Sequence, residues 1–490
     1  MMRLFVNIDS LNIPDWQKFC IGRLSQEYGE VNVLSLSKLV CSSYGWLKKL
    51  QIKIEDKLSL VNHEINDDIT DSLINSCRAP QKGDIILDLT GTISVTDEYS
   101  GARIWIPFYN GQHLSHISSI GECELIHKSA TFNIDLCENG FLLDSASYNP
   151  HYSAVKNWKI AAYSLHWLVI KCLRNNVQPA KSITSEKRSI PNIRYSYYFY
   201  KSVAQKLLSA YANKFWGYYR ERWTIGLAKG SFLSDGIGKM KILSEPRNEF
   251  WADPFLYYHK ESRKTILFIE RFPFKEKKGV ISCAEVDSNL GINGMYDILV
   301  RDYHFSYPHI IEEHGELYMM PESSANQQLE VYKCVSFPYQ WKLYTTAFHG
   351  LRVADTVYYK DNNGDSWLFT TYSDSSIDLH CTMLMIYKVD SINLKTIIPH
   401  KKNPILINST CARNGGRIYE EKGKVYRVSQ DNSHRMYGHG INIHEITRLT
   451  IDDYEEILVS HTEENDLPQG IGTHQMCQID NMFVMDIRKH

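Results

Sequence analysis

Residues 255–270 read FLYYHKESRKTILFIE, in which two apolar runs rich in aromatic and β-branched residues flank the polar turn Lys260-Glu261-Ser262-Arg263. This pattern is typical of a β-hairpin. Four further hairpins with Gly-, Asn- or Asp-containing turns follow at 309–322, 356–371, 417–430 and 474–486. Their starts are about 50–60 residues apart, the scale of one propeller blade. We predict a five-bladed β-propeller over residues 225–490, with 225–243 completing the last blade and closing the ring.

An ionisable residue opens each predicted hairpin. These residues are Asp253, His309, Asp355, Arg413 and His474. The innermost strands of a propeller surround its axis, so we expect the five side chains to converge there. Each has a structural explanation by itself, because Asp before Pro initiates turns and a histidine in a strand is usually a hydrogen-bonded core residue. Their recurrence at the start of every predicted hairpin favours a functional site.

The second strands return to the same side of the propeller and add further polar residues, Glu270, Glu322 and Gln430, with Arg413 or Arg427 as the cation. Carboxylates and imidazoles suit acid–base work at a sugar hydroxyl or anomeric centre, and arginine suits a phosphate or carboxylate. We predict Asp253, Asp355 and Glu322 as catalytic residues. We predict Glu270, His309, Arg413, Arg427, Gln430 and His474 as substrate-binding residues.

No metal or cofactor is predicted. The chain has no H-E-x-x-H or similar ligand spacing, and no D-x-D motif of metal-dependent sugar transfer. It also has no G-x-G-x-x-G after its first strand and no P-loop, so dinucleotide and P-loop phosphate binding have no support in the sequence.

The first 180 residues predict a small α/β domain. Apolar runs at 3–8 and 31–37 flank an amphipathic stretch from Pro14 to Tyr28, which indicates a β-α-β opening. Residues 84–91 form an unalternating apolar run, as expected of a parallel strand buried on both faces. Shorter strands at 102–109 and 140–144 and a long helix over 153–175 complete the predicted domain.

Residues 181–224 predict a basic, aromatic, helical connector. The 490 residues carry a formal charge of -2, yet residues 151–240 hold 15 Lys and Arg against 3 Asp and Glu. We favour an interdomain helix, and a surface that contacts anionic lipid headgroups is the alternative. No nucleic-acid recognition motif is present. Without a signal peptide or an apolar run long enough to span a bilayer, we expect a cytoplasmic protein, with peripheral membrane contact through 181–224 under the alternative.

A set of motifs from about residue 245 onward resembles the N-terminal-domain family of glucosamine inositolphosphorylceramide transferase. The motifs are Phe250-Trp251-Ala252-Asp253-Pro254-Phe255, Tyr307-Pro308-His309, Met320-Pro321-Glu322-Ser323, Arg413-Asn414-Gly415-Gly416, Tyr426-Arg427-Val428-Ser429-Gln430-Asp431, Tyr437-Gly438 and Gly472-Thr473-His474. The set covers about half of the chain. It is specific in combination.

That family in turn resembles the five-bladed propeller of glycoside hydrolase family 43. The resemblance implies that Asp253 is a general base and that Asp355 tunes the general acid. Arg413-Asn414 stand where that family has its general-acid Glu, which argues against hydrolysis by the standard two-carboxylate scheme. Glu322 takes the acid role only if the ring geometry brings it there.

Residues 80–175 distantly resemble formyltransferase N-terminal domains, in which an Asn, a His and an Asp carry the chemistry. The corresponding stretch, Ile104-Trp105-Ile106-Pro107-Phe108-Tyr109-Asn110-Gly111, lacks the Asn-x-His of that family. We therefore expect a degenerate domain that orients the acceptor and does not transfer formyl groups.

Three functional hypotheses follow. The leading one is a glycosyltransferase or related glycan-assembly enzyme that uses an activated sugar donor and a surface-polysaccharide or glycolipid acceptor. In it Asp253 deprotonates the acceptor, Arg413 and His309 stabilise a departing phosphate, and Asp355 and Glu322 hold the sugar. The alternatives are a family 43-type glycoside hydrolase and a non-catalytic glycan-binding module.

Overall fold

The computed structural model describes residues 3–8, 13–35, 79–93, 101–117, 119–179, 181–182, 196–201, 204, 208, 211, 222–237, 240–373, 380–462, 466–468 and 470–489. The chain divides into two compact units, Met1–Leu207 and Leu208–His490, and each is described by itself. The finer division at 180 and 224 stays a prediction.

The first unit is built on one mixed sheet with the strand order β2-β1-β3-β4-β6-β7-β8, and β5 pairs with β4. The strands are β1 (Leu4–Ile8), β2 (Val31–Ser35), β3 (Ile85–Asp88), β4 (Arg103–Tyr109), β5 (Gln112–His113), β6 (Phe132–Glu138), β7 (Phe141–Tyr148) and β8 (Lys181–Ser182). The first four are parallel, and β6 joins β4 antiparallel. The α/β prediction is confirmed, including the β-α-β opening.

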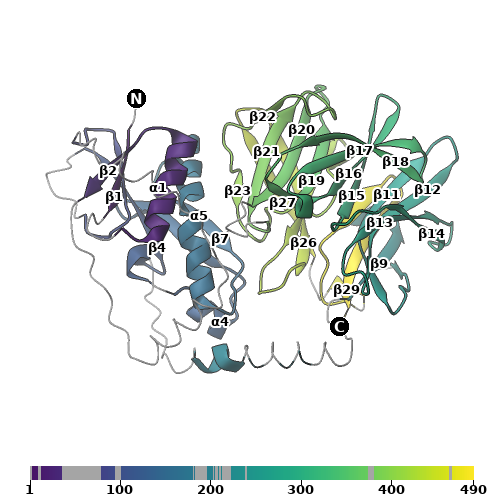
Figure 1. The fold of residues 1–490 in the computed structure, drawn as a ribbon, viewed down its shortest axis with the longest axis horizontal. Helices are drawn as coiled ribbons and strands as arrows, with labels where there is room; N and C mark the ends of the chain where they lie inside the picture. The colour runs from purple at the N-terminus through teal and green to yellow at the C-terminus, as the bar shows by residue number, and fades with distance from the viewer. Residues whose placement is uncertain are drawn as a thin grey trace. The chain divides into compact units, whose positions relative to one another are not determined.

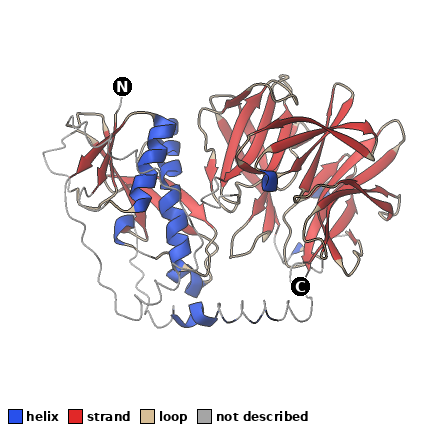
Figure 2. Cartoon of the chain, viewed as in Figure 1, coloured by secondary structure: helices blue, strands red, loops and turns tan. Residues whose placement is uncertain are grey.

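Two helices, α1 (Asp15–Tyr28) and α5 (Ala154–Asn175), stand side by side in Figure 2. Phe19 of α1 and Tyr163 of α5 meet edge to face with ring centroids 5.2 Å apart. The Ser153 side chain caps α5 by accepting from Lys156 N, which satisfies one of the unpaired amides of the first turn. The short helix α4 (Glu122–His127) precedes β6. The helix predicted over 153–175 is confirmed.

The second unit is the predicted five-bladed propeller. Its first three sheets each follow chain order, and their strands are β11 (Glu249–His259), β12 (Lys264–Pro273), β13 (Val280–Val286), β14 (Ile292–Leu299), β15 (Ser306–Glu313), β16 (Glu316–Glu322), β17 (Leu329–Ser336), β18 (Gln340–Ala347), β19 (Arg352–Lys360), β20 (Ser366–Ser373), β21 (Met383–Val389), β22 (Ile397–Pro399) and β23 (Leu406–Ile407). The fourth sheet contains β24 (Tyr419–Glu421), β25 (Lys424–Asp431), β26 (Gly440–Leu449) and β27 (Tyr454–Thr462). All five predicted hairpins are present.

The fifth sheet joins the start of this unit to its end. It contains β9 (Arg222–Lys229), β10 (Lys241–Ile242), β28 (Met476–Ile479) and β29 (Met482–Lys489), in the order β10-β9-β29-β28. β29 pairs antiparallel with β9 from Met482 opposite Lys229 to Lys489 opposite Arg222, and Figure 1 shows the yellow β29 beside the teal β9. The short helix α7 (Phe232–Asp235) connects β9 and β10. The prediction that 225–243 completes the last blade is therefore confirmed.

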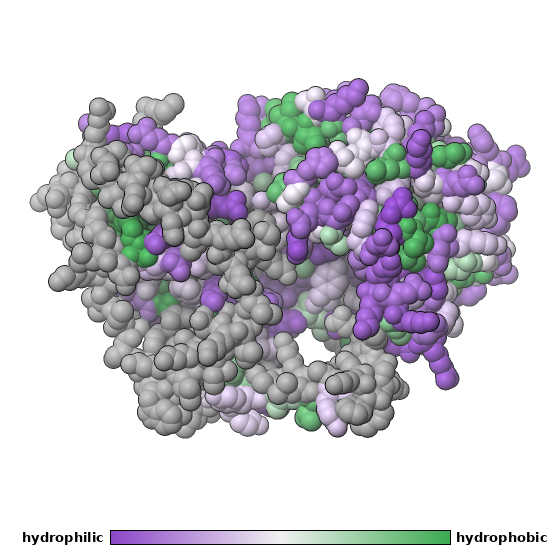
Figure 3. All heavy atoms as spheres, viewed as in Figure 1, coloured by the Kyte–Doolittle hydropathy of each residue, from purple (hydrophilic) through white to green (hydrophobic). Residues whose placement is uncertain are grey.

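The largest propeller core cluster draws residues from all five sheets. Its fully buried members include Phe255, Phe268, Phe369, Ile386 and Val484. In the view of Figure 3, hydrophilic side chains cover most of the visible propeller surface, with small hydrophobic patches between them. The predicted site residues Asp253, Asp355 and Gln430 are buried as well, so they do not belong to the solvated outer surface.

Most of the predicted connector lies outside the described residues. Residues 196–201, 204, 208 and 211 are helical. Tyr197, Tyr200 and Tyr211 are exposed there, whereas Phe199 is buried against Leu125 and Ala154. No helix in the described part of the chain is both long and apolar enough to cross a lipid bilayer.

Candidate functional site

The first strands of blades one to three share one backbone irregularity. In β11, β15 and β19 the pairing skips two residues, after Ala252, Ser306 and Ala354. The first skipped residue is left-handed each time, with φ of 50° at Asp253, 48° at Tyr307 and 46° at Asp355. A bulge of this kind re-aims a side chain, and non-glycine residues adopt such a φ only when the surrounding structure holds them there. Three blades therefore present Asp253, Tyr307 and Asp355 in equivalent positions.

The second strand of each hairpin supplies a residue beside the bulge position of the first strand. Glu270 pairs with Ala252, Glu322 with Ser306 and Thr371 with Ala354, each beside the bulge. In the fourth blade Gln430 N donates to Arg413 O, and in the fifth Asp486 N donates to Gln475 O. This repeat places Glu270, Glu322 and Gln430 as predicted. It also adds Asp486, which the sequence analysis left out although it ends the fifth predicted hairpin.

A buried histidine links two of these carboxylates. His474 Nε2 lies 2.8 Å from Asp253 Oδ1, and His474 Nδ1 lies 3.0 Å from Asp486 Oδ2. Burial opposes a charge on His474, but the two flanking carboxylates outweigh it and raise the pKa of the imidazole to about 10. Asp253 also accepts from Tyr307 N at 3.0 Å, and its own N–H donates to Asp486. The predicted site residues Asp253 and His474 are thus in direct contact.

Asp253, His474 and Asp486 also have the spacing of a metal cage, because their ligand atoms lie within 4.8 Å of one another. Both imidazole nitrogens, however, lie within ion-pair distance of a carboxylate oxygen. A metal ligand needs a neutral imidazole, whereas a histidine between two carboxylates keeps both protons. The group therefore fits a carboxylate–imidazolium–carboxylate arrangement better than a cation site. The absence of a metal stays a prediction.

Arg413 joins the carboxylates of two other blades. Its Nε donates to Asp355 Oδ2 at 2.6 Å and its Nη2 donates to Glu322 Oε2 at 3.2 Å. Gln430 Nε2 donates to the same Asp355 oxygen at 2.7 Å, and Asn414 Nδ2 donates to the Asp355 backbone carbonyl. Asp355 is fully buried with these donors around it. Three predicted site residues from different blades, Arg413, Glu322 and Asp355, are in contact.

Two carboxyl groups in the cluster favour the protonated form. Burial, the charge of Asp355 and a hydrogen bond to Asp355 raise the pKa of Glu322 well above its usual value, although Arg413 opposes them. Burial and the charge of Asp253 likewise raise the pKa of Glu270. A neutral carboxylic acid beside ionised carboxylates is the arrangement that separates a proton donor from a proton acceptor. Glu322 therefore has the character of an acid.

The cluster is reached through its more exposed members. The side chain of His304 is 38% exposed and its Nε2 lies 3.4 Å from Glu270 Oε1, while the side chain of Glu322 is 15% exposed. Tyr437 is 36% exposed and lies under the Arg413 guanidinium, 5.3 Å from it. Its ring is also 5.1 Å from that of His474. Neither His304 nor Tyr437 is among the predicted site residues. Tyr437 could have been found from the Tyr437-Gly438 motif.

Tyr307 lies at the buried side of the cluster. Its hydroxyl donates to Gly416 O at 2.9 Å and accepts from Gly416 N at 3.0 Å, which ties blade two to the start of blade four. Its ring meets Phe255 edge to face at 4.9 Å. The bulge position in blade two is therefore held by a structural aromatic residue, and the sequence analysis had assigned that position to His309.

His309 and Arg427 lie outside the carboxylate cluster, and Arg427 reaches it only through a 3.4 Å hydrogen bond from Nη1 to Asn414 Oδ1 in the described structure. His309 is buried beside Phe255, and its Nε2 lies 3.2 Å from Tyr358 O. Burial and the charge of Arg417 lower the pKa of His309 to about 3, so it is neutral. Arg427 forms a two-pronged ion pair with Glu456, with both distances 2.7 Å, and donates to Cys411 O. These two side chains support the blades.

Comparison with solved structures gives proteins of low sequence identity. One is a β-xylosidase designated RS223, which is 10% identical, covers 50% of this chain and 95% of its own, and superimposes with a TM-score of 0.35. Another is an exo-1,5-α-L-arabinanase from a bovine ruminal metagenomic library, which is 10% identical, covers 51% of this chain and 100% of its own, and has a TM-score of 0.33.

Curated relatives are more similar in sequence. The chain is 33% identical over 237 residues to glucosamine inositolphosphorylceramide transferase 1 of Arabidopsis thaliana, a match that covers 48% of this chain and 29% of the relative. It is 30% identical over 217 residues to the protein of the same name from Oryza sativa subsp. indica, covering 44% and 28%. The chain thus spans less than a third of the length of the curated relatives it matches.

The resemblance expected from the motifs is confirmed for the propeller, and the formyltransferase-like character of residues 80–175 stays a prediction. Residues 239–476, just under half of the chain, match the family described as glucosamine inositolphosphorylceramide transferase 1, N-terminal.

Proposed function

We propose that the propeller is a glycan-assembly enzyme that transfers a glycosyl group from a sugar donor to a hydroxyl of a glycan or glycolipid. The observation that carries this proposal is the contact of Arg413 with both Asp355 and Glu322, where burial and the charge of Asp355 raise the pKa of Glu322, in a cluster that also contains Asp253. The name of the relatives, glucosamine inositolphosphorylceramide transferase 1, supports a transfer reaction.

In the proposed step, Asp253 takes the proton of the acceptor hydroxyl while the oxygen of that hydroxyl attacks the anomeric carbon. The bond between the anomeric carbon and the leaving oxygen breaks, its electron pair stays on that oxygen, and Glu322 gives its proton to it. Exchange with solvent then returns a proton to Glu322 and removes one from Asp253. The net change is the exchange of one alcohol for another at the anomeric carbon.

The charges of the cluster suit this step. Three aspartates, Asp253, Asp355 and Asp486, outnumber the two cations that contact them, Arg413 and His474. The remaining negative charge favours the oxocarbenium-like centre that develops at the anomeric carbon.

The contacts of Arg413 bear on the kind of leaving group. Its guanidinium is already paired with Asp355 and donates a hydrogen bond to Glu322, so it offers little uncompensated charge to a phosphate. His309, the second group expected to stabilise a departing phosphate, is neutral and bonded elsewhere. We therefore favour a leaving oxygen that Glu322 protonates, and we assign Arg413 to holding the Asp355 side chain in place.

The test is a donor–acceptor assay on the full chain with Glu322→Gln and Asp253→Asn. Each variant removes one proton-transfer group at nearly constant shape, and a loss of 10²- to 10⁴-fold in product formation is expected. Glu312→Gln is the matched control, because Glu312 is exposed on β15, where it accepts a hydrogen bond from the Tyr257 hydroxyl. If Glu322→Gln and Asp253→Asn form product as fast as Glu312→Gln, the proposal is wrong, and a non-catalytic glycan-binding role replaces it.

Hydrolysis is the second candidate, because a neutral Glu322 supplies the acid that Arg413 does not. Water would then take the place of the acceptor, and Asp253 would activate it. The two reactions differ in their products. Release of free sugar that is independent of acceptor concentration indicates hydrolysis, whereas a glycosylated acceptor that grows with acceptor concentration indicates transfer.

A further inference from the structure

A cavity of about 480 Å³ lies at the hairpin-turn end of blade one, away from the carboxylate cluster. None of its lining residues belongs to the cluster, although the wall extends from Lys264 at the start of β12 to Cys283, which pairs with Phe268 two residues before Glu270; Lys264 itself lies six residues before Glu270. At about 3.3 Å per residue this separation is about 20 Å. The cavity has the size of a small-ligand pocket. It is therefore distinct from the candidate site.

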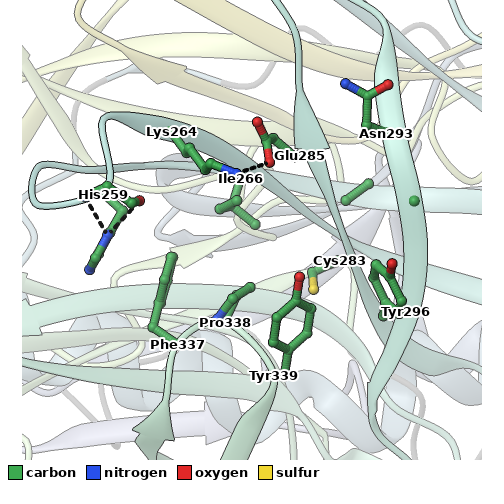
Figure 4. A pocket seen from close by; sticks show the side chains of 13 residues that line it. His259, Lys264, Ile266, Cys283, Glu285, Asn293, Tyr296, Phe337, Pro338 and Tyr339 are labelled. Atoms are coloured by element: carbon green, nitrogen blue, oxygen red, sulfur yellow. Dashed lines mark hydrogen bonds and ion pairs between the residues drawn. The ribbon is translucent and has the colours of Figure 1, made fainter.

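Aromatic rings form one side of this pocket, as Figure 4 shows for Phe337, Tyr339 and Tyr296. Phe337 stacks on His259 with ring centroids 4.2 Å apart and an angle of 13° between the planes. Tyr296 and Tyr339 meet edge to face at 5.3 Å, and both remain more than half exposed. Two rigid aromatic side chains are thus held at the mouth with most of their surface available.

The backbone of β14 is adapted to hold Tyr296 in this position. The pairing of β13 and β14 is irregular between Cys283 and Glu285, and Gly294 in this stretch has φ of 69°. A Cβ at Gly294 would lie 2.6 Å from Cε2 of Tyr296. The tyrosine ring therefore covers the bare face of the glycine, where any other residue would displace it.

Hydrogen-bonding groups form the other side, where Figure 4 shows Lys264, Glu285 and Asn293. Lys264 Nζ lies 2.6 Å from Glu285 Oε2, so the two charges compensate each other. His259 Nδ1 accepts from the backbone N–H of Ser262, which leaves the proton on Nε2 and makes Nε2 a donor. An amide, an ion pair and an imidazole N–H thus face a pocket whose other wall is aromatic.

This combination selects the class of ligand. An anion would need an uncompensated cation, and Lys264 is already paired. A purely apolar ligand would displace water from the Lys264–Glu285 pair without offering hydrogen bonds in its place. Covalent capture is disfavoured, because burial raises the pKa of the Cys283 thiol at the pocket wall to about 12. A neutral, hydroxyl-rich ring with one apolar face satisfies both walls, since aromatic rings pack on apolar faces and the polar wall takes hydroxyl groups.

We propose that this pocket is a second binding site, which takes a neutral oligosaccharide with a sugar ring packed on Tyr296 and Tyr339 and its hydroxyls on Glu285, Asn293 and His259. The site holds a glycan chain on the propeller at residues that the carboxylate cluster does not share. It does not depend on the reaction at that cluster, because binding needs none of its residues.

The experiment is an array of neutral oligosaccharides of gluco, galacto, manno, xylo and arabino configuration, with uronic-acid and sulfated oligosaccharides beside them. The full chain carries Glu322→Gln so that no probe is turned over. We expect retention of at least one neutral series, followed by calorimetry with its best member. Tyr296→Ala and Tyr339→Ala should each weaken that binding about fivefold to tenfold, and Tyr296→Phe should restore most of it.

Tyr258→Ala is the matched control, since Tyr258 is an exposed tyrosine of β11 that does not line the pocket. Gly294→Ala adds a variant that moves the Tyr296 ring without removing it, and it should also weaken binding. The proposal is overturned if no neutral oligosaccharide is retained, if the charged probes bind better, or if Tyr258→Ala weakens binding as much as Tyr296→Ala. Failure of the donor–acceptor assay would leave these binding results unchanged, so the two proposals fail separately.

Discussion

His474 Nε2 lies 2.8 Å from Asp253 Oδ1, and the same imidazole ring reaches Asp486 on its other side. Asp253 opens blade one, whereas His474 and Asp486 belong to blade five, where β9 and β29 close the ring. The contact therefore joins the first blade to the last by charge as well as by packing. It also makes the stability of the propeller depend on pH.

Replacing His474 by Asn should remove this pH dependence. In the folded chain the pKa of His474 is raised to about 10 from an ordinary value of 6.5, so the folded state retains a proton that the unfolded state releases. The stabilisation is complete below about pH 6.5 and is lost as the pH rises to about 10, with an upper bound of about 5 kcal/mol. Urea unfolding of the two proteins at pH 6 to 10 measures it. The difference in unfolding free energy should shrink steadily over this range.

His309→Asn is the control for that series. The pKa of His309 is lowered to about 3, so this residue is neutral in the folded and unfolded states above pH 7.5. Its replacement should cost a constant free energy between pH 7.5 and 10. A constant difference for His474→Asn as well would contradict the assigned ion pairs.

Arg413 should couple strongly to Asp355 and weakly to Glu322. Arg413→Ala removes the cation that compensates the buried Asp355 charge and leaves Gln430 and Glu322 as its side-chain partners, which should cost about 3–5 kcal/mol. Because Asp355→Asn removes that charge, the double variant Asp355→Asn/Arg413→Ala should lose far less than the sum of the single losses. Glu322 favours the neutral form, so Glu322→Gln should give a near-additive cycle with Arg413→Ala. Unfolding free energies at pH 7 decide between these patterns, and equal coupling in both cycles would refute the neutral Glu322.

The sequence pattern predicted which end of the hairpins carries the candidate site. Period-two strands and polar turns located the five hairpins, and residues that end their second strands met at the axis. Asp486 ends the second strand of its hairpin, as Glu270 and Glu322 do, so the sequence pattern could have predicted it. Arg427 was predictable as well, because it lies three residues before Gln430 in an unbroken stretch of β25, and an odd separation puts two side chains on opposite faces.

The positions of the bulges could not be predicted from the sequence. The counterpart of Asp253 in blade two is Tyr307, which also precedes a proline, and His309 lies two residues later. Blade three makes the same bulge at Asp355-Thr356 without a proline, so no single local motif marks it. The left-handed conformation there depends on contacts between blades, such as Tyr307 N to Asp253 Oδ2, and these cannot be read from one strand.

Tyr307→Phe should destabilise the propeller without changing its packing. The hydroxyl of Tyr307 satisfies both the N–H and the C=O of Gly416, all in a buried setting. The phenylalanine ring fills the same space but leaves two backbone groups unpaired, so a loss of about 2–4 kcal/mol is expected. Thermal unfolding measures the loss. Tyr258→Phe on the surface of β11 is the control and should change stability by no more than about 0.5 kcal/mol.

Gly416→Ala should destabilise the propeller by pushing apart the segments of the fourth and fifth blades that meet beside the site. A Cβ on Gly416, whose φ is 152°, would lie 1.8 Å from Met476 O, and that backbone continues directly from His474. Neither side can yield easily, because Met476 N already donates to Gly415 O at 2.7 Å and Gly416 holds Tyr307. A loss of about 3 kcal/mol or more is expected. Gly423→Ala in the β24–β25 turn has a φ of 76° but no atom within 4 Å, so it should cost only about 1 kcal/mol. Equal losses in urea unfolding would mean that the close approach of these two segments does not limit stability, and that Gly416 is retained for its backbone conformation alone.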